Sequence, residues 1–205
     1  NNNILAQAQV IAIMREIFLR KTGKWVNSTQ MLILMYAAAH NDDGIIHQFK
    51  TGQGKSIITV MRSAYQALSG KTVDVFSAKN TLSERDHKEF EHVYTAFGIA
   101  SSHIVSDSSP DQYKVGGVNY ATPGNMSIFF SKNAWDDSQV DGRKAHDCVA
   151  FVDEADHVLL DEDTEFNFVA GSENESFINY DEWVYNTVYE FYKEKLDGEA
   201  DHEIK

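Results

Sequence analysis

The stretch IIHQFKTGQGKS, residues 45–56, places an apolar run directly before a glycine-rich turn and a lysine. The apolar residues 45–49 predict a short strand, and the apolar spacing of residues 55–65 predicts a helix. Gly52 and Gly54 between them predict a loop that turns the chain from strand to helix. The order of strand, glycine loop and helix is typical of α/β domains with a mainly parallel sheet.

The same stretch has the residue types of a phosphate-binding loop. Such a loop turns consecutive backbone amides inward, which requires glycine where a side chain would collide with the ligand. A lysine at the start of the next helix reaches the outer phosphates, and an adjacent hydroxyl can bind Mg²⁺. We therefore assign nucleotide binding to Thr51, Gly52, Gln53, Gly54, Lys55 and Ser56, with Ser56 also a magnesium ligand. Phe49 stands where the strict pattern has glycine, and a glycine turn that only caps a helix is the alternative.

A second motif follows the apolar run CVAFV, residues 148–152, which predicts a buried strand. Asp153 and Glu154 come directly after this strand. One carboxylate there can hold a metal ion with its water shell, and the next can take a proton from an attacking water. We assign Asp153 to Mg²⁺ and Glu154, together with Lys55, to catalysis. Each motif alone has a structural alternative, here a solvated turn or a helix N-cap, but both in this order favour a nucleotide site.

The rest of the chain alternates between strand and helix patterns. Strands are predicted at residues 73–78, 103–106 and 117–121, and helices at residues 9–20, 30–36 (capped by Ser28) and 82–97. This alternation predicts helices on both faces of the sheet and ligands at the carboxyl ends of the strands. We assign residues 1–171 to this domain, with a helical part at 1–40. A change of composition at residues 171–176 begins a C-terminal helical extension, residues 172–205.

Composition limits the classes of partner. The chain of 205 residues has 31 acidic and 18 basic residues and a formal net charge of −13, which disfavours nucleic acid but not a nucleotide held by Mg²⁺ and backbone amides. The lone Cys148 excludes an internal disulfide framework. No apolar run approaches the roughly 20 residues that a transmembrane helix needs. We expect a soluble, cytoplasmic protein, to which the family resemblance described below adds peripheral contact with a membrane. The start at Asn1, without methionine, suggests a piece of a longer chain.

Several motifs resemble SecA, the ATPase motor of bacterial preprotein export. The loop at residues 49–56 looks like that family's phosphate loop, and LSERD at 82–86 resembles its L-A-Q-R-D. RK at 143–144 and VDEADHVLLDE at 152–162 resemble R-K and V-D-E-V-D-S-I-L-I-D-E, the most specific block. The likeness extends from about Gln30 to Gly171.

This resemblance implies a RecA-like P-loop NTPase domain that uses ATP or ADP with Mg²⁺ and acts on a polypeptide. It implies a second RecA-like domain, in the parent chain or a partner, whose arginine would assist hydrolysis, so that this domain alone is a weak ATPase. Gln30 is similar to the glutamine that reads adenine in SecA and in DEAD-box helicases, or else it is an ordinary residue at the start of a helix.

Departures from the family keep two alternatives open. The letters D-E-A-D at residues 153–156 and TPGN at 122–125 resemble DEAD-box RNA helicases, but Asn125 replaces the RNA-gripping arginine, so we read residues 122–125 as a plain turn. Gln53 replaces an acidic residue of SecA, and DTEFN at 163–167 replaces A-R-T-P-L. The second alternative is a non-catalytic interaction module derived from SecA. The histidines lack metal-ligand spacing.

Overall fold

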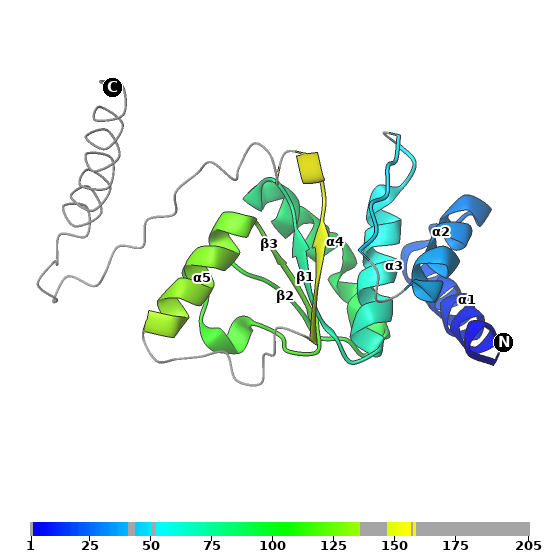
Figure 1. Cartoon of the computed structure of the whole chain (residues 1–205), viewed down its shortest axis with the longest axis horizontal. Helices are drawn as coiled ribbons and strands as arrows, with labels where there is room; N and C mark the ends of the chain where they lie inside the picture. The colour runs from blue at the N-terminus through cyan, green and yellow to red at the C-terminus, as the bar shows by residue number, and fades with distance from the viewer. Residues whose placement is uncertain (1, 41–43, 51, 136–146, 157, 159–205) are drawn as a thin grey trace, which may run out of the picture. The chain divides into compact units, whose positions relative to one another are not determined.

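A computed structural model describes residues 2–40, 44–50, 52–135, 147–156 and 158 of the chain. Within these residues, four parallel strands form one sheet in the order β2-β3-β1-β4 (Figure 1). The strands are β1 (Thr72–Phe76), β2 (Ser101–His103), β3 (Val118–Ala121) and β4 (Cys148–Val152). Phe76, the last residue of β1, is in register with Ala121 of β3 and Val152 of β4, so the carboxyl ends of these strands meet at one edge. The predicted α/β class is confirmed.

Helices cover both faces of this sheet, as the sequence predicts. They are α1 (Asn2–Thr22), α2 (Ser28–Ala39), α3 (Lys55–Leu68), α4 (Asn80–Ala96) and α5 (Pro123–Trp135), with a short 3₁₀ turn at Pro110–Gln112. In Figure 1, α5 lies on one side of the sheet and α3 on the other, with α1 and α2 beyond α3. Side chains along a strand point alternately to opposite faces, so each strand contributes residues to both sides of the sheet.

The larger hydrophobic core joins α1, α2, α3 and α4 to one face of the sheet, with Val73, Val75 and Tyr120 among its buried residues. Phe18 of α1 stacks on Phe90 of α4 with ring centroids 6.4 Å apart. The smaller core lies under α5 and includes Ile104, Tyr113, Ala121, Met126 and Phe129. Burial of these apolar side chains, at about 25 cal/mol per Å², is the main force that fixes the helices on the sheet.

The prediction of a strand at residues 45–49 is wrong. Residues 44–50 form neither strand nor helix, although their exposure alternates as in a strand. Ile45, His47 and Phe49 are partly buried, whereas Ile46 and Gln48 are exposed. The sequence pattern reports which side chains turn inward, but a strand also requires backbone pairing with a neighbour.

Two helix starts also differ from the prediction. Asn27, rather than Ser28, is the N-cap of α2, because its side chain accepts a hydrogen bond from the backbone N–H of Gln30. The TPGN stretch is the start of α5 rather than a plain turn, with Pro123 as its first residue. Thr122 Oγ1 accepts a hydrogen bond from the N–H of Asn125 at 3.2 Å. A strand was predicted at residues 103–106, but the observed strand, β2, lies earlier in the chain, at Ser101–His103.

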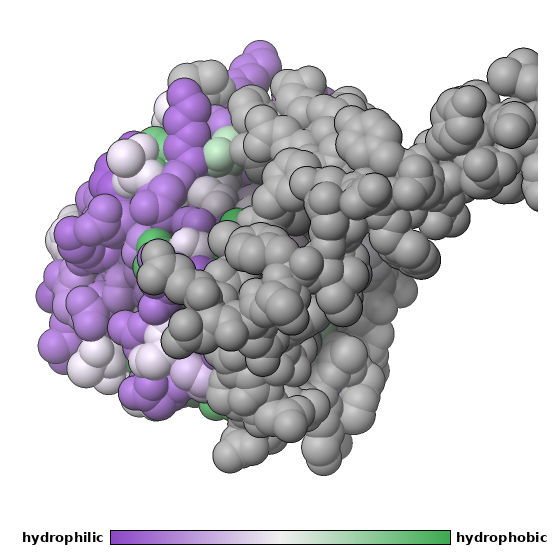
Figure 2. Space-filling view, turned by 90° about the vertical axis from the view of Figure 1, so that its left-hand side faces the viewer, coloured by the Kyte–Doolittle hydropathy of each residue, from purple (hydrophilic) through white to green (hydrophobic). Residues whose placement is uncertain are grey.

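The chain divides into two units, Asn1–Val169 and Ala170–Lys205. The second unit lies outside the described residues, so the helical extension from residue 172 stays a prediction. On the face shown in Figure 2, the described residues are mostly hydrophilic, in keeping with the chain's 24% of charged residues. No helix in the described part of the chain is both long and apolar enough to cross a membrane.

Candidate functional site

The glycine loop ends in a backbone conformation that favours glycine. Gly54 is the N-cap residue of α3 and has φ 75° and ψ 41°, and Gly52 has φ 81°. A side chain at either position would be strained, since this left-handed region is costly for residues with a Cβ atom. The first N–H groups of a helix have no partner within the helix, so the start of α3 offers them to an anion. Thr51, also assigned to the loop, lies outside the described residues.

The side chain of Gln30 in α2 forms hydrogen bonds with the backbone of this loop. Its side-chain Nε2 donates to the backbone oxygens of Gln53 at 3.1 Å and Gly54 at 3.4 Å. Its Oε1 accepts from the N–H of Asn27 at 2.9 Å, and the N–H of Gln30 donates to Asn27 Oδ1 at the same distance. Only 4% of Gln30 is exposed. A Cβ atom on Gly54 would lie 2.5 Å from Gln30 Nε2, so glycine is needed there for this close approach.

Lys55 and Asp153 come together across the site. Lys55 begins α3, Asp153 follows β4, and the Lys55 ammonium forms an ion pair with the Asp153 carboxylate. The N–H of Asp153 donates to the backbone oxygen of Phe76 at 2.8 Å. This hydrogen bond extends the pairing of β4 with β1 by one residue and holds the backbone of Asp153 in place. The side chains are 43% and 28% exposed, so both remain accessible from solvent.

Glu154 has the only positive φ among the described non-glycine residues, at 53°. Its N–H donates to Asp153 Oδ1 at 2.9 Å, and its backbone oxygen accepts from the N–H of Val158 at 3.0 Å. The chain therefore turns sharply at the end of β4 into a helical turn. The Glu154 side chain is exposed. Backbone strain of this kind costs about 1–3 kcal/mol and is concentrated at functional sites.

The start of α4 lies near the Asp153 carboxylate. Burial raises the pKa of Asp86, the hydrogen bond and charge of Arg85 lower it, and the charge of Asp153 raises it further. Two guanidinium nitrogens of Arg85 donate to one oxygen of Asp86, at 2.9 and 2.7 Å. The LSERD stretch, singled out from the sequence, thus places an ion pair within electrostatic reach of Asp153.

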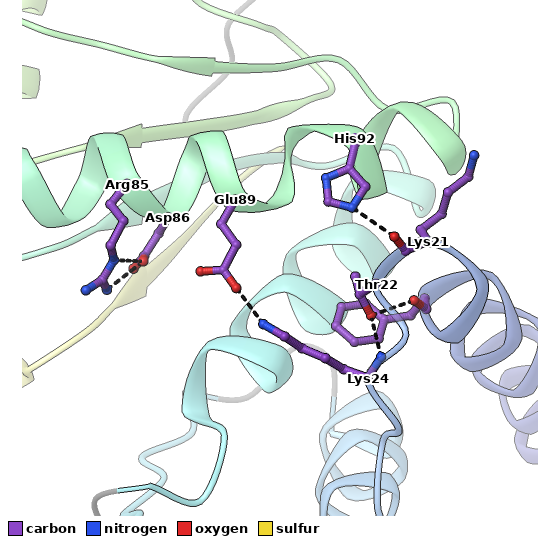
Figure 3. A network of polar contacts seen from close by, with 8 residues as sticks. Lys21, Thr22, Lys24, Arg85, Asp86, Glu89 and His92 are labelled. Atoms are coloured by element: carbon purple, nitrogen blue, oxygen red, sulfur yellow. Dashed lines mark hydrogen bonds and ion pairs between the residues drawn. The ribbon is translucent and has the colours of Figure 1, made fainter.

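Further along α4, polar contacts join this helix to the end of α1 and to the linker that follows it (Figure 3). Glu89 pairs with Lys24 at 2.6 Å, and His92 lies 3.3 Å from the backbone oxygen of Lys21. Since Gln30 follows this linker and contacts the loop, α2 connects the glycine loop to the rest of the core.

The donor set suits a magnesium nucleotide. Hydroxyl and carboxylate oxygens, as on Ser56 and Asp153, are the ligands that Mg²⁺ prefers, and this ion usually needs only one or two of them besides phosphate and water. The Asp153 carboxylate already attracts one cation, the Lys55 ammonium. No group of three or more His, Cys, Asp or Glu side chains in the described residues could form an all-protein metal site.

The structure thus brings Gln30, Gln53, Gly54 and the pair of Lys55 and Asp153 to one place, with Ser56 next along α3 and Glu154 next after Asp153. Sequence reasoning missed Asn27, which orients Gln30. The spacing Asn-x-x-Gln at residues 27–30 is a capping-box pattern and could have identified it.

Comparison with known proteins identifies relatives of the chain. The SecA DEAD-like domain family matches residues 2–203. The protein translocase subunit SecA of Cyanidioschyzon merolae is 29% identical over 79% of this chain and 20% of that protein. SecA of Synechococcus sp. is 28% identical over 96% of this chain and 21% of that protein, and SecA 2 of Clostridioides difficile is 29% identical over 88% and 23%. The chain spans about a fifth of the length of these relatives.

Proposed function

Since this chain belongs to the SecA DEAD-like domain family, we propose that it binds and hydrolyses ATP with Mg²⁺ and couples this turnover to the movement or remodelling of a polypeptide. The observation that carries the proposal is the convergence of the glycine loop, Lys55 and Asp153 at the carboxyl edge of the parallel sheet. This edge is where α/β proteins bind their ligands.

Each assigned residue has a role that its charge and position support. The amides of Gly52, Gln53 and Gly54 and the ammonium of Lys55 would hold the phosphates, since the helix start and the lysine both favour negative charge. Ser56 and Asp153 would hold Mg²⁺, which supplies charge neutralisation at the phosphates when it is bound.

Glu154 would orient or deprotonate the attacking water. Its exposed carboxylate follows Asp153 directly and is held on a strained turn. Gln30 would support the loop through Nε2, and the second lone pair of its Oε1 would accept a hydrogen bond from the adenine amino group.

The coupling to a polypeptide rests on the relatives, which are named protein translocase subunits. We infer a second RecA-like domain in the parent protein or a partner, because transfer of a phosphoryl group in such motors uses an arginine that can raise the rate by about 10³–10⁵. A cytoplasmic location with peripheral membrane contact is part of the same proposal.

The test is single-turnover hydrolysis of Mg·ATP by this chain and by a longer form of the parent protein that includes the following domains. We expect slow hydrolysis by the chain and a rate higher by about 10³ or more in the longer form. A longer form that binds Mg·ATP without any hydrolysis would favour a non-catalytic interaction module instead.

A further inference from the structure

Arg62 contacts both chain segments that lead into the candidate site. It lies on α3, two turns after Lys55, and its Nη1 is 3.2 Å from Nε2 of His47. Its guanidinium carbon lies 5.3 Å from the ring centroid of Phe151 in β4. A guanidinium can only donate, so Nε2 of His47 is the acceptor, and the proton of the neutral imidazole is on Nδ1.

The first of these segments, residues 44–50, depends on its side chains for its position. Within the described part of the chain it forms neither strand nor helix, and it leads to the glycine loop. The side chain of Phe49 packs against the main hydrophobic core, and its ring centroid lies 5.9 Å from that of His47. The contact between His47 and Arg62 is the polar link from this segment to α3 in the described residues.

The second segment is β4, which ends at the carboxylates. Phe151 precedes Asp153 by two residues, and the ring that Arg62 covers is partly buried. A guanidinium within about 6 Å of an aromatic ring centroid is attracted by the electrons of the ring. One side chain thus bridges the segment that enters the loop and the strand that ends at Asp153.

We propose that Arg62 is a positioning residue, which through His47 and Phe151 fixes the nucleotide loop relative to Asp153 and loses this hold when His47 takes up a proton. The inference rests on the proposed nucleotide site, and it adds a residue that makes the affinity of that site depend on pH.

The surroundings of His47 keep its imidazole neutral at neutral pH. Burial lowers the pKa of His47 below 6.5, and the positive charge of Arg62 lowers it further. The charged side chains of α3 are Lys55 and Arg62, the segment itself carries Lys50, and β4 carries none, so no carboxylate from these elements offsets the effect. Once protonated, His47 can no longer accept from Arg62 and is repelled by it.

The experiment measures the affinity of the full chain for Mg·ADP by calorimetry between pH 7.5 and pH 5.5. We expect wild-type affinity to fall on acidification by about tenfold more than that of His47→Gln, whose amide oxygen can accept from Arg62 but does not titrate. Arg62→Met should bind about tenfold more weakly at pH 7.5 and show the weaker pH dependence of His47→Gln. His40→Gln, at an exposed histidine, is the matched control and should follow the wild type.

A second readout separates positioning from a merely structural role. Because coupling between two binding events is reciprocal, Mg·ADP should lower the pKa of His47 further in an NMR titration. If wild type and Lys55→Ala bind Mg·ADP equally, or neither binds, the nucleotide site and this inference both fail. If the wild type binds, Lys55→Ala does not, and His47→Gln keeps the wild-type pH profile, only the role of Arg62 and His47 is overturned. Circular dichroism identifies any variant that does not fold, and His47→Gln decides the question if Arg62→Met is one of them.

Discussion

The ammonium of Lys55, in the first turn of α3, forms an ion pair with the carboxylate of Asp153, the residue that follows β4. Both side chains are partly exposed. An ion pair in such a position contributes about 0–1 kcal/mol to stability, so it is a minor part of what holds the fold together. Its importance is chemical, because it places a cation and a carboxylate together beside the helix start that the glycine loop leaves open.

We expect Lys55→Ala to weaken Mg·ADP binding by about 100-fold or more while the free energy of unfolding changes by about 1 kcal/mol or less. The ammonium would contact phosphate directly, whereas its pair with Asp153 adds little stability. Calorimetric titration and urea denaturation measure the two effects. Lys88→Ala, which removes an exposed lysine on another helix, α4, is the control. Equal affinity of wild type and Lys55→Ala would show that the phosphate site is misassigned.

Glu154→Gln should keep the affinity for Mg·ATP and lower turnover by about 10²–10⁴ in the longer parent protein. The amide preserves the shape of the side chain and leaves Asp153 unchanged, but it cannot accept the proton of the attacking water. Binding and single-turnover rates should therefore separate. A Glu154→Gln protein with wild-type turnover would remove this residue from the mechanism.

Gln30→Ala tests two roles of one buried side chain. Loss of the donor to Gln53 and Gly54 should lower the free energy of unfolding by about 1–3 kcal/mol, because two partly buried hydrogen bonds, each worth about 0.5–1.5 kcal/mol, are lost. We expect ADP affinity to fall by more than GDP affinity, since ADP alone would lose the adenine contact while both lose the support of the loop. Titrations with the two nucleotides measure this difference. Equal losses would leave Gln30 as a support of the loop only.

Single-stranded RNA should bind weakly at physiological ionic strength, given the net charge of −13. Asn125, at the start of α5, is a neutral amide that donates through Nδ2 to Asn80 Oδ1 at 3.0 Å, so it supplies no positive charge for an RNA phosphate. Fluorescence anisotropy with labelled RNA over a range of salt concentrations is the measurement. Tight binding with a steep salt dependence would support the RNA helicase alternative.

Stability should fall as the pH drops below 6.5, because His87 of α4 and His103 of β2 are partly buried and resist protonation in the folded chain. Burial is the main reason that the pKa of each is lowered from 6.5. His87 Nε2 lies 3.2 Å from Ser101 Oγ, and Nε2 of His103 is buried without a hydrogen-bond partner among the residues that the structure describes.

The direction of this change in stability with pH follows from the difference in proton binding between the folded and the unfolded chain. With a lowered folded-state pKa, the unfolded chain takes up protons first, so the contribution of these residues is complete above pH 6.5 and is lost as the pH falls through their folded-state pKa values. Urea denaturation at pH 7.5 and pH 5.5 should show this loss, and His87→Gln should reduce it, whereas His40→Gln should not. An unchanged loss in His87→Gln would mean that His87 makes no contribution.

The sequence predicted the strands β1, β3 and β4 and helices α1 to α4 to within a few residues at most ends. These elements carry strong local patterns: alternation or runs of apolar residues in the strands, and helical spacing in α3 and α4. The whole of helix α5 was missed, because Thr-Pro-Gly-Asn also fits a turn, and only the packing of Met126 and Phe129 into the smaller core distinguishes the two.

By itself, the sequence determined the glycine loop, the helix that begins at Lys55 and the acidic end of β4, because each depends on residues that are neighbours in the chain. Only the tertiary structure decided that Gln30 supports the loop, that Lys55 meets Asp153, and that Arg62 links His47 to Phe151. It also decided that residues 45–49 do not pair as a strand. These features depend on residues far apart in the sequence, whose side chains meet only after the helices have packed on the sheet, and no local pattern records which partners that packing selects.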